Sequence, residues 1–160
     1  MKAIMTSRLL LAIVLTSAIC NCSLLRHRSV VFQGTSMLPT IKDGERLQII
    51  RLDSTLKSIG RGDIVVFWSP MDTSKFYIKR VIGLPGDRIE IRGGEVWLNQ
   101  SRLREPYLSQ KLNMSQRSQP MLTVPPQNYF IMGDNRDNSA DSRIFGCVPE
   151  GLIYAKVVRK

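Results

Sequence analysis

From residue 29 onward, the chain is a succession of short apolar segments separated by turn-forming residues. The segments are rich in β-branched and aromatic residues and are bounded by Gly, Pro, Asp or Asn, a pattern typical of β-strands. The expected strands are residues 29–33, 47–52, 63–68, 76–82, 88–92, 95–98, 128–132 and 152–158. The sequence therefore predicts an all-β fold, a barrel or coiled sandwich of short antiparallel strands.

The connections between these strands carry signals of their own. Residues 87–98 are expected to form a hairpin that turns at Gly93 and Gly94, a dipeptide suited to a tight turn. Residues 109–127 lack periodicity and are expected to form a surface loop. After residue 28 no amphipathic helix of useful length is expected, although residues 53–59 could form one helical turn. The span from Asp87 to Gly133 is short, so any accessory β-domain must be small.

The first part of the chain has a different character. Residues 9–25 form a run of 17 residues without a charge, the short end of what a membrane-spanning helix needs. We therefore expect residues 1–28 to be an N-terminal tail with a single transmembrane helix, followed by a β-domain over residues 29–160. A cleavable secretory signal has the same layout, and Ala18–Cys20 is an acceptable cleavage site. A lipoprotein site at Cys20 fits less well, because the bulky Ile19 stands where a small residue is expected.

The charge distribution favours a membrane surface. The formal net charge is +10, and all 13 acidic residues lie at or beyond Asp43. Four basic residues flank the uncharged run: Lys2, Arg8, Arg26 and Arg28. Strongly basic chains bind nucleic acid or anionic lipid. Because the sequence has no helix-turn-helix pattern, zinc finger or dense cluster of Lys and Arg, we expect the lipid bilayer as a partner and no nucleic acid.

The residue inventory excludes several kinds of chemistry. The one histidine, His27, stands beside the uncharged run, so we interpret it as an interfacial residue and not as the base of a Ser-His-Asp triad. The sequence lacks clustered Cys and His for a zinc site, a phosphate-binding loop and a dinucleotide fingerprint. Cys147, alone in the β-domain, is expected to be a small core residue. No cofactor or metal is expected, and acyl chemistry would need a lysine as its base.

The densest polar segment is residues 133–143, which follow an expected strand. Its carboxylates are Asp134, Asp137 and Asp141, and they alternate with Arg136 and Arg143. Because neighbouring guanidinium groups favour ionised carboxylates, we expect these acids to stay charged and not to share a proton. A loop with this many polar contacts is either a salt-bridged turn or the support of a functional site.

Ser36 and Lys79 are the candidate catalytic residues. Ser36 stands where strand 29–33 gives way to a turn, so its hydroxyl can face outward; a serine that caps its own backbone is the alternative. Lys79 lies in an apolar strand, where alternation requires either Lys79 or Arg80 to point inward. With a reference pKa of about 10.4, roughly one lysine in 2,500 is neutral at pH 7, and a depression of about 2 units raises that share about a hundredfold. A lysine that snorkels to the surface is the alternative.

Four segments, in chain order, resemble the motifs of the type I signal peptidase family, membrane-bound serine proteases that cut signal peptides from exported proteins. They are Ser36-Met-Leu-Pro-Thr40, Arg61-Gly-Asp-Ile-Val-Val-Phe67, Lys79-Arg-Val-Ile-Gly-Leu-Pro-Gly-Asp87 and Gly133-Asp-Asn-Arg-Asp-Asn-Ser-Ala-Asp-Ser-Arg143. The resemblance covers most of residues 30–160. It implies that Ser36 is the nucleophile and Lys79 the base. It also implies that Ser139 hydrogen-bonds the lysine, while Asp141 with Arg143 braces the site.

The mechanism implied by the resemblance is a Ser/Lys dyad that works through an acyl-enzyme. The oxyanion would be held by the backbone N–H of Ser36 and one further donor. Some members of the family have a serine two residues before the nucleophile as that donor, where this chain has Gly34. Small side chains are expected at the first and third positions before the cut, in a substrate bound as an added strand. The expected pocket residues are Val30, Phe32 and Ile78, with ordinary core packing as the alternative.

The resemblance also implies where the enzyme works. It favours a retained transmembrane anchor over a cleaved signal, and an extracytoplasmic catalytic domain at residues 29–160. The expected location is the inner (plasma) membrane, with a thylakoid membrane as the alternative. Preprotein signal peptides are the expected substrates. Trp68 is expected either to dip into lipid headgroups or to be buried.

Two other functions stay open from the sequence. A self-cleaving, repressor-type protease shares the Ser/Lys fold, but it should carry a DNA-binding domain and an internal Ala-Gly cleavage site, and the sequence has neither. The alternative from a different class is an inactive β-barrel that binds peptides at the membrane. Loss of preprotein cleavage on substitution of Ser36 and of Lys79 would separate the dyad enzyme from both.

Overall fold

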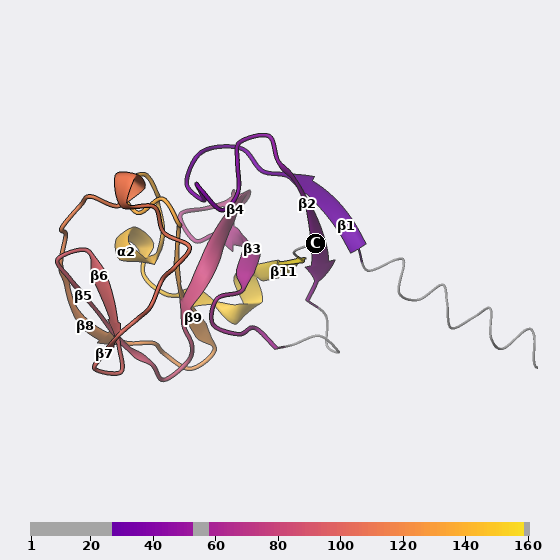
Figure 1. Ribbon diagram of the computed structural model, residues 1–160. Helices are drawn as coiled ribbons and strands as arrows, with labels where there is room; N and C mark the ends of the chain where they lie inside the picture. The colour runs from indigo at the N-terminus through magenta and orange to yellow at the C-terminus, as the bar shows by residue number, and fades with distance from the viewer. Residues whose placement is uncertain (1–26, 53–57, 159–160) are drawn as a thin grey trace, which may run out of the picture.

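The structure is a computed structural model that describes residues 27–52 and 58–158. Its strands form two antiparallel sheets, one of seven strands in the order β1-β2-β11-β3-β4-β9-β10 and one of four in the order β7-β6-β5-β8 (Figure 1). The strands are β1 (His27–Val31), β2 (Arg46–Arg51), β3 (Ile64–Ser69), β4 (Asp72–Gly83), β5 (Arg88–Arg92), β6 (Glu95–Leu98), β7 (Ser101–Arg102), β8 (Gln119–Thr123), β9 (Asn128–Met132), β10 (Val148–Pro149) and β11 (Ile153–Val158). Three single-turn helices accompany them: η1 (Gln110–Leu112), α2 (Ser142–Phe145) and η2 (Glu150–Leu152). The prediction of an all-β fold of short antiparallel strands is confirmed.

Three clusters of buried apolar side chains form the core. The first contains Met37 and Ile78, and it lies under the turn that carries Ser36. The second is built around Phe67, in the middle of the large sheet. The third joins the small sheet to β9 through Ile89 and Phe130. Because fully burying a side chain of this size contributes about 1.5–3 kcal/mol, the two sheets are held together by a shared apolar interior.

β4 is the strand that carries Lys79, and it changes environment along its length. Its first six residues are exposed or half-buried, and its last six are buried. On one side β4 pairs with β3 as far as Arg80, and on the other side the last residues of β4, from Arg80 to Gly83, pair with β9. Lys79 and Arg80 are 4% and 5% exposed, so both are buried on opposite faces of the strand. The sequence required one of them to point inward, and the structure buries both, because this part of β4 is covered on both faces.

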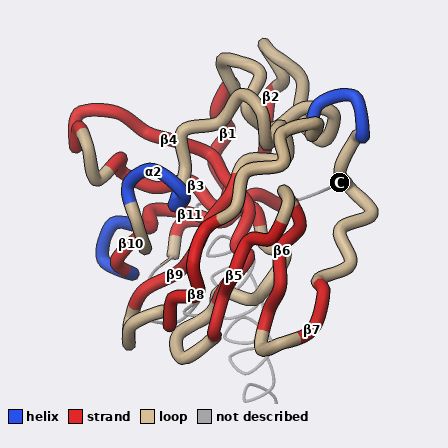
Figure 2. The backbone as a smooth tube through the Cα atoms, turned by 90° about the vertical axis from the view of Figure 1, so that its left-hand side faces the viewer, coloured by secondary structure: helices blue, strands red, loops and turns tan. Residues whose placement is uncertain are grey.

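The small sheet follows the expected hairpin, which the structure confirms at β5 and β6. Gly93 and Gly94 turn the chain with φ of 54° and 85°, the left-handed region in which glycine is unstrained. Figure 2 views this sheet face on and shows β5 between β8 and β6. The accessory β-unit between Asp87 and Gly133 is thus a four-stranded sheet, small as expected.

Some segments differ from the expected ones. Residues 109–127 contain η1 and β8, and β8 pairs with β5, with Arg88 opposite Thr123. This strand was missed because it is short, contains Pro120 and shows no alternation of apolar and polar residues; its pairing with the edge of β5 makes it a strand. The first strand covers His27–Val31 and not residues 29–33.

The expected membrane anchor, residues 1–28, lies outside the described residues except for its last two. The expected helical turn at residues 53–59 likewise falls almost wholly outside them. Within residues 27–52 and 58–158, no helix combines the length and the apolarity that a bilayer crossing requires.

Candidate active site

Ser36 lies in the turn that follows β1, and this turn is held by the apolar core and by the polar loop 133–143. Met37, which follows it, is fully buried and fixes the turn to the core. The backbone N–H of Asn135 donates to the carbonyl of Ser36 at 3.0 Å, and the Asn135 side-chain amide donates to the carbonyl of Thr35 at 3.2 Å. The turn serine is therefore held by the polar loop 133–143, which lies about a hundred residues later in the chain. A serine that only caps its own turn would not need this support.

Lys79 meets Ser36 directly. Its Nζ lies 2.7 Å from Ser36 Oγ and also donates to the carbonyl of Ile78 at 3.0 Å. Burial lowers the pKa of Lys79 to about 8, against the opposing effect of the Asp141 and Asp134 carboxylates. The structure therefore brings the two predicted residues together, one from a turn and one from β4, although they are 43 positions apart in the chain. Because the Lys79 amine is desolvated, it is neutral in a substantial fraction of molecules near neutral pH.

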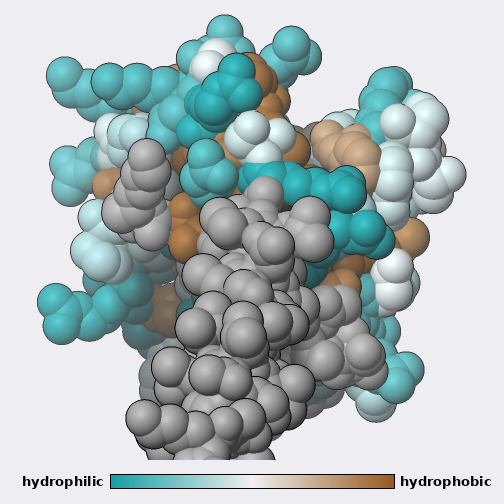
Figure 3. Space-filling view, turned by 90° about the vertical axis from the view of Figure 1, so that its right-hand side faces the viewer, coloured by the Kyte–Doolittle hydropathy of each residue, from teal (hydrophilic) through white to brown (hydrophobic). Residues whose placement is uncertain are grey.

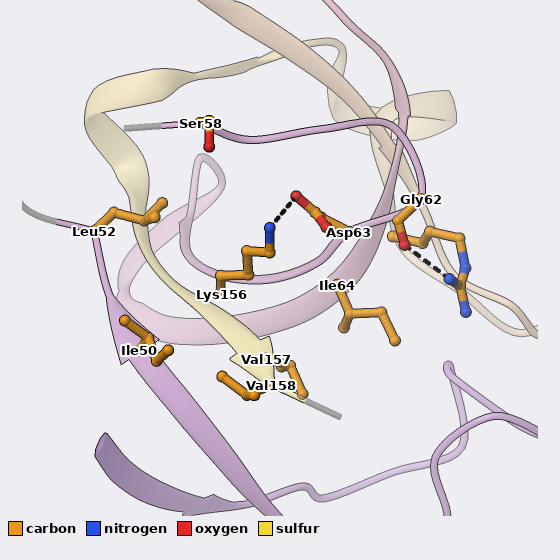
Figure 4. Close-up of a pocket in the computed structure, with 10 residues that line it drawn as sticks. Ile50, Leu52, Ser58, Gly62, Asp63, Ile64, Lys156, Val157 and Val158 are labelled. Atoms are coloured by element: carbon orange, nitrogen blue, oxygen red, sulfur yellow. Dashed lines mark hydrogen bonds and ion pairs between the residues drawn. The ribbon is translucent and has the colours of Figure 1, made fainter. Parts of the chain in front are cut away.

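A second lysine illustrates the opposite situation (Figure 4). Lys156 lines a cavity of about 450 Å³ between β2, β3 and β11, and Ser58 lies on the same cavity. Its Nζ lies 2.7 Å from Asp63 Oδ2, and its side chain is 36% exposed. Among the described residues, Lys79 has no such carboxylate partner. Lys156 is thus a charged, paired lysine, whereas the environment of Lys79 suits a proton acceptor.

Asp141 and Arg143 form the expected brace. Arg143 donates to both carboxylate oxygens of Asp141, from Nε and Nη2, each at 2.8 Å. Asp141 also accepts the backbone N–H of Gly133 at 2.9 Å. Although burial raises the pKa of Asp141, the Arg143 guanidinium and the Gly133 N–H together hold it below its ordinary value. The carboxylate stays ionised while fully buried, and the loop 133–143 is closed upon itself.

The other acids of this loop do not pair with their neighbours in sequence. Asp134 accepts from Arg80 of β4, with Nε at 2.8 Å and Nη2 at 2.6 Å, and the Thr40 hydroxyl donates to the same carboxylate. Asp137 caps backbone N–H groups instead of an arginine. Of the three acids in this loop, Asp141 alone pairs with one of the two neighbouring arginines, Arg143, among the described residues. Arg80 was missed, although its place directly after Lys79 in an apolar strand was a signal that it needs a buried partner.

Ser139 is close to the dyad but does not make the expected bond. Its Oγ is buried and has no hydrogen-bond partner among the described residues, so the hydrogen bond to Lys79 is not formed. A Cβ added at Gly133 would overlap both Ser139 Oγ and the carbonyl oxygen of Ser36. Glycine at position 133 is therefore required by the close approach of these two serines.

Gly34 provides backbone geometry. Its φ of 104° is in the left-handed region, which allows the sharp turn before Ser36. Its N–H donates to Asp43 Oδ1 at 2.7 Å, so this N–H is committed and not available to an oxyanion. The backbone N–H of Ser36, by contrast, has no acceptor among the described residues. Asp43 is a support residue that the sequence analysis did not single out.

A groove of about 700 Å³ leads to the Ser36–Lys79 contact. The three expected pocket residues line it: Val30 from β1, Phe32 directly after this strand, and Ile78 beside Lys79. Phe32 and Ile78 also belong to the core, so pocket wall and core packing are here the same role. Further lining residues that the sequence analysis did not single out are Val66, Tyr77, Asn138, Ala140 and Tyr154.

Comparisons with known proteins identify the family to which the chain belongs. The family described as "Signal peptidase, peptidase S26" matches residues 3–159. Signal peptidase I U of Bacillus subtilis is 34% identical over 148 residues, which cover 89% of this chain and 79% of that protein. Signal peptidase IB of Staphylococcus aureus is 35% identical over 140 residues, covering 78% of this chain and 72% of that protein.

A solved structure extends the likeness to the fold. A signal peptidase I from Enterococcus faecalis is 32% identical to the chain, with a TM-score of 0.53, and the match covers 64% of this chain and 98% of that chain. The family match spans nearly the whole sequence, and the solved structure shares the fold over 64% of it. The chain belongs to the signal peptidase family, peptidase S26, and is a serine endopeptidase of the signal peptidase I kind.

Proposed function

We propose that this enzyme cleaves signal peptides from exported preproteins after small residues, through a Ser36/Lys79 dyad and an acyl-enzyme. The observation that carries the proposal is the 2.7 Å contact between Lys79 Nζ and Ser36 Oγ in a site where burial lowers the pKa of the lysine. A serine hydroxyl is a weak nucleophile until a base takes its proton, and this pair supplies both groups. An inactive peptide binder does not account for a buried lysine without an ion pair to any described carboxylate. A repressor-type protease would share the dyad, but the sequence has neither the DNA-binding domain nor the internal Ala-Gly cleavage site that it needs.

The reaction begins when the hydroxyl of Ser36 attacks the scissile carbonyl carbon. As the new C–O bond forms, the hydroxyl proton moves to neutral Lys79. The lysine, now charged, gives that proton to the leaving amine when the C–N bond breaks, which returns it to the neutral form. A water molecule then attacks the ester carbonyl and Lys79 takes its proton. When the bond between the carbonyl carbon and Ser36 Oγ breaks, Lys79 gives this proton to Oγ, which restores the serine hydroxyl and the neutral amine and releases the carboxylic acid product.

The negative oxygen that develops on the scissile carbonyl needs fixed donors. The backbone N–H of Ser36, which has no acceptor within residues 27–52 and 58–158, is the first. Gly34 has no hydroxyl, and its N–H is held by Asp43, so it contributes turn geometry and not a donor. Removing one donor of this kind typically lowers the rate by about 10² to 10³.

The substrate is expected to bind as an extended strand in the groove. β1 lies at one edge of the large sheet, so one side of its backbone has no neighbouring strand among the described residues. In β4, the residues before Arg80 pair with β3 on one side and with no described strand on the other. An extended peptide can therefore pair with free backbone groups on these strands, while alternate side chains enter pockets. Val30, Phe32 and Ile78 narrow the groove at the dyad, which favours small side chains there.

Cleavage of a defined preprotein tests this function. A preprotein with Ala at the first and third positions before the cut should be processed at that bond, as read from the N-terminal sequence of the product. Replacing either Ala by Phe should lower kcat/KM by at least about a hundredfold, because a large side chain must displace groove walls that belong to the core. Equal processing of the Phe substrates would reject the proposed specificity.

We further propose that residues 1–28 anchor the enzyme in the inner (plasma) membrane and that residues 29–160 act on its outer side. The uncharged run of residues 9–25 and the net charge of +10 support this. On the β-domain, Trp68 is half-buried and stacks on Phe76 with ring centroids 3.4 Å apart, beside a hairpin whose Met71 is 64% exposed. Figure 3 views the end of the molecule that carries β1 and β2, where hydrophobic surface appears between hydrophilic side chains.

Lipid contact at this hairpin can be measured by fluorescence. In the full chain reconstituted into vesicles, the Trp97→Phe variant retains Trp68 alone, and brominated lipids are expected to quench it. The Trp68→Phe variant retains Trp97, which lies in the small sheet under the Arg92 guanidinium, and should be quenched much less. Equal quenching of the two variants, or none in either, would contradict the placement of Trp68 at the headgroups.

A further inference from the structure

A segment outside the four motifs lies against the polar loop 133–143. It is residues 103–115, which follow β7 and lead toward β8. The side chain of Asn113 accepts the backbone N–H of Arg136 at 2.7 Å. The backbone N–H groups of Met114 and Ser115 donate to the carboxylate of Asp137 at 2.7 and 2.9 Å. The small sheet therefore reaches the loop that supports the dyad through direct hydrogen bonds.

Two buried ion pairs meet in this region, and Tyr107 connects them. The first is Arg80 with Asp134, whose side chains are 6% and 0% exposed. The second is Arg136 with Glu105, whose side chains are 4% and 7% exposed. The ring of Tyr107 lies with its centroid 3.9 Å from Cζ of Arg80, and its hydroxyl donates to Glu105 Oε1 at 2.6 Å. The contacts run from Asp134 through Arg80, Tyr107 and Glu105 to Arg136.

These contacts close into a ring, because Asp134 and Arg136 are two residues apart in the same loop. Between them lies Asn135, whose N–H holds the carbonyl of Ser36. At the far side of the ring, Arg80 directly follows Lys79 on β4. The ring therefore fixes the chain on both sides of the Ser36–Lys79 contact, and opening it at one link would loosen both. Neither Tyr107 nor Glu105 lines the substrate groove.

We propose that Tyr107 and Glu105 are positioning residues that hold Lys79 and Ser36 in hydrogen-bonding register. They do so by locking Arg80 and Arg136 against the loop 133–143. The proposal rests on the proposed dyad function and deepens it. Its physical basis is the steep dependence of rate on geometry, since a misplacement of about 1 Å can lower a rate by about a hundredfold. Tyr107 can act without touching the reacting atoms because the cation–π contact and the ion pairs are desolvated, where each is strongest.

If Lys79 and Ser36 lose their relative position, the balance of charges around the Lys79 amine should change as well. The groups that face Lys79 Nζ are the carboxylates of Asp141 and Asp134, the Arg143 guanidinium and the ring of Tyr77. The two carboxylates raise the pKa of Lys79 and Arg143 lowers it, while burial is the largest effect. When Arg80 moves away from Asp134, that carboxylate is less compensated, so the pKa of Lys79 rises. A purely structural residue, remote from this balance, would not move it.

The test replaces Tyr107 in the full chain and measures preprotein cleavage as a function of pH. Tyr107→Leu removes the ring from Arg80, and kcat is expected to fall about tenfold or more while KM changes less than about twofold. The acid limb of kcat/KM should move to higher pH by about half a unit. Tyr107→Phe keeps the ring and loses only the bond to Glu105, so its kcat should lie between those of the wild type and Tyr107→Leu.

Trp97→Leu is the matched control. It removes a contact of the same kind, between the Trp97 ring and the Arg92 guanidinium at 4.5 Å, within the small sheet but away from the dyad. Its kcat and acid limb should stay at the wild-type values. If Tyr107→Leu is unfolded at the assay temperature, Tyr107→Met, whose unbranched and flexible side chain fills irregular space more readily, takes its place with the same readouts.

Each outcome has a definite reading. Folded Tyr107 variants with an unchanged kcat and an unchanged acid limb would overturn the inference, as would an equal loss in Trp97→Leu. If Ser36→Ala is inactive while the Tyr107 variants behave like wild type, the positioning role alone is wrong. If Ser36→Ala still cleaves, the dyad function itself is wrong, whatever the Tyr107 variants do.

Discussion

Ser36→Ala and Lys79→Met are each expected to abolish preprotein cleavage, with kcat lowered by about 10⁴ or more. Ser36→Ala removes the hydroxyl that accepts from the buried amine at 2.7 Å. Lys79→Met keeps the apolar stem of the side chain and removes the proton acceptor. Lys79→Arg should be equally inactive, because a guanidinium does not deprotonate in a protein. Single-turnover assays with excess enzyme measure the residual rate. Because the two residues act as one unit, the double variant should be no slower than either single variant.

Two controls separate loss of chemistry from loss of fold. Lys156→Met replaces the lysine that is paired with Asp63, outside the groove, and should retain wild-type kcat. Ser101→Ala replaces an exposed serine of β7 and should do the same. All variants should keep the wild-type far-ultraviolet circular dichroism spectrum. Cleavage at more than a few per cent of the wild-type rate by a folded Ser36→Ala or Lys79→Met variant would exclude the dyad.

The rate of preprotein cleavage is expected to depend strongly on pH, which is the second large effect. Burial lowers the pKa of Lys79 to about 8, and only the neutral amine can accept the serine proton. The neutral fraction then rises about fiftyfold between pH 6 and pH 8. The value of kcat/KM should therefore increase about tenfold for each pH unit below pH 7 and level off above pH 8 to 9. Measuring kcat/KM from about pH 5.5 to about pH 10 checks this pH dependence. An acid limb near the histidine reference pKa of about 6.5 would point to a different base.

The same titration has a consequence for stability, with a defined sign. The folded pKa of Lys79, about 8, is below that of a lysine in an unfolded chain. Between these two values the unfolded state binds more protons, so the free energy of unfolding rises with pH across that window. At pH 7 the buried lysine destabilises the fold by about 3 kcal/mol relative to its stability above the unfolded pKa. Lys79→Met should lack this pH dependence and be more stable than wild type at pH 7, as measured by urea unfolding.

The sequence predicted a large part of this protein because its signals are local. Alternating β-branched and aromatic residues between turns identify most strands, since each strand must present one face or both to a core. Gly93 and Gly94 identify the β5–β6 hairpin in the same way. Ser36, Lys79, Asp141 and Arg143 stand in compact motifs whose spacing is itself the signal. Where the pattern was weak, as at β8, the strand is created by its pairing partner, and a single sequence does not contain that information.

What the sequence determined by itself was the all-β class, the hairpin of the small sheet and the candidates Ser36 and Lys79. Only the tertiary structure decided that both Lys79 and Arg80 are buried, that Asp134 pairs with Arg80 and Arg136 with Glu105, and that the Lys79 amine lies 2.7 Å from the Ser36 hydroxyl. The physical reason is that strand alternation depends on neighbouring residues, whereas desolvation and ion pairing depend on which distant segments cover a side chain. A charge in a sequence has many potential partners, and the packing of the two sheets selects one of them.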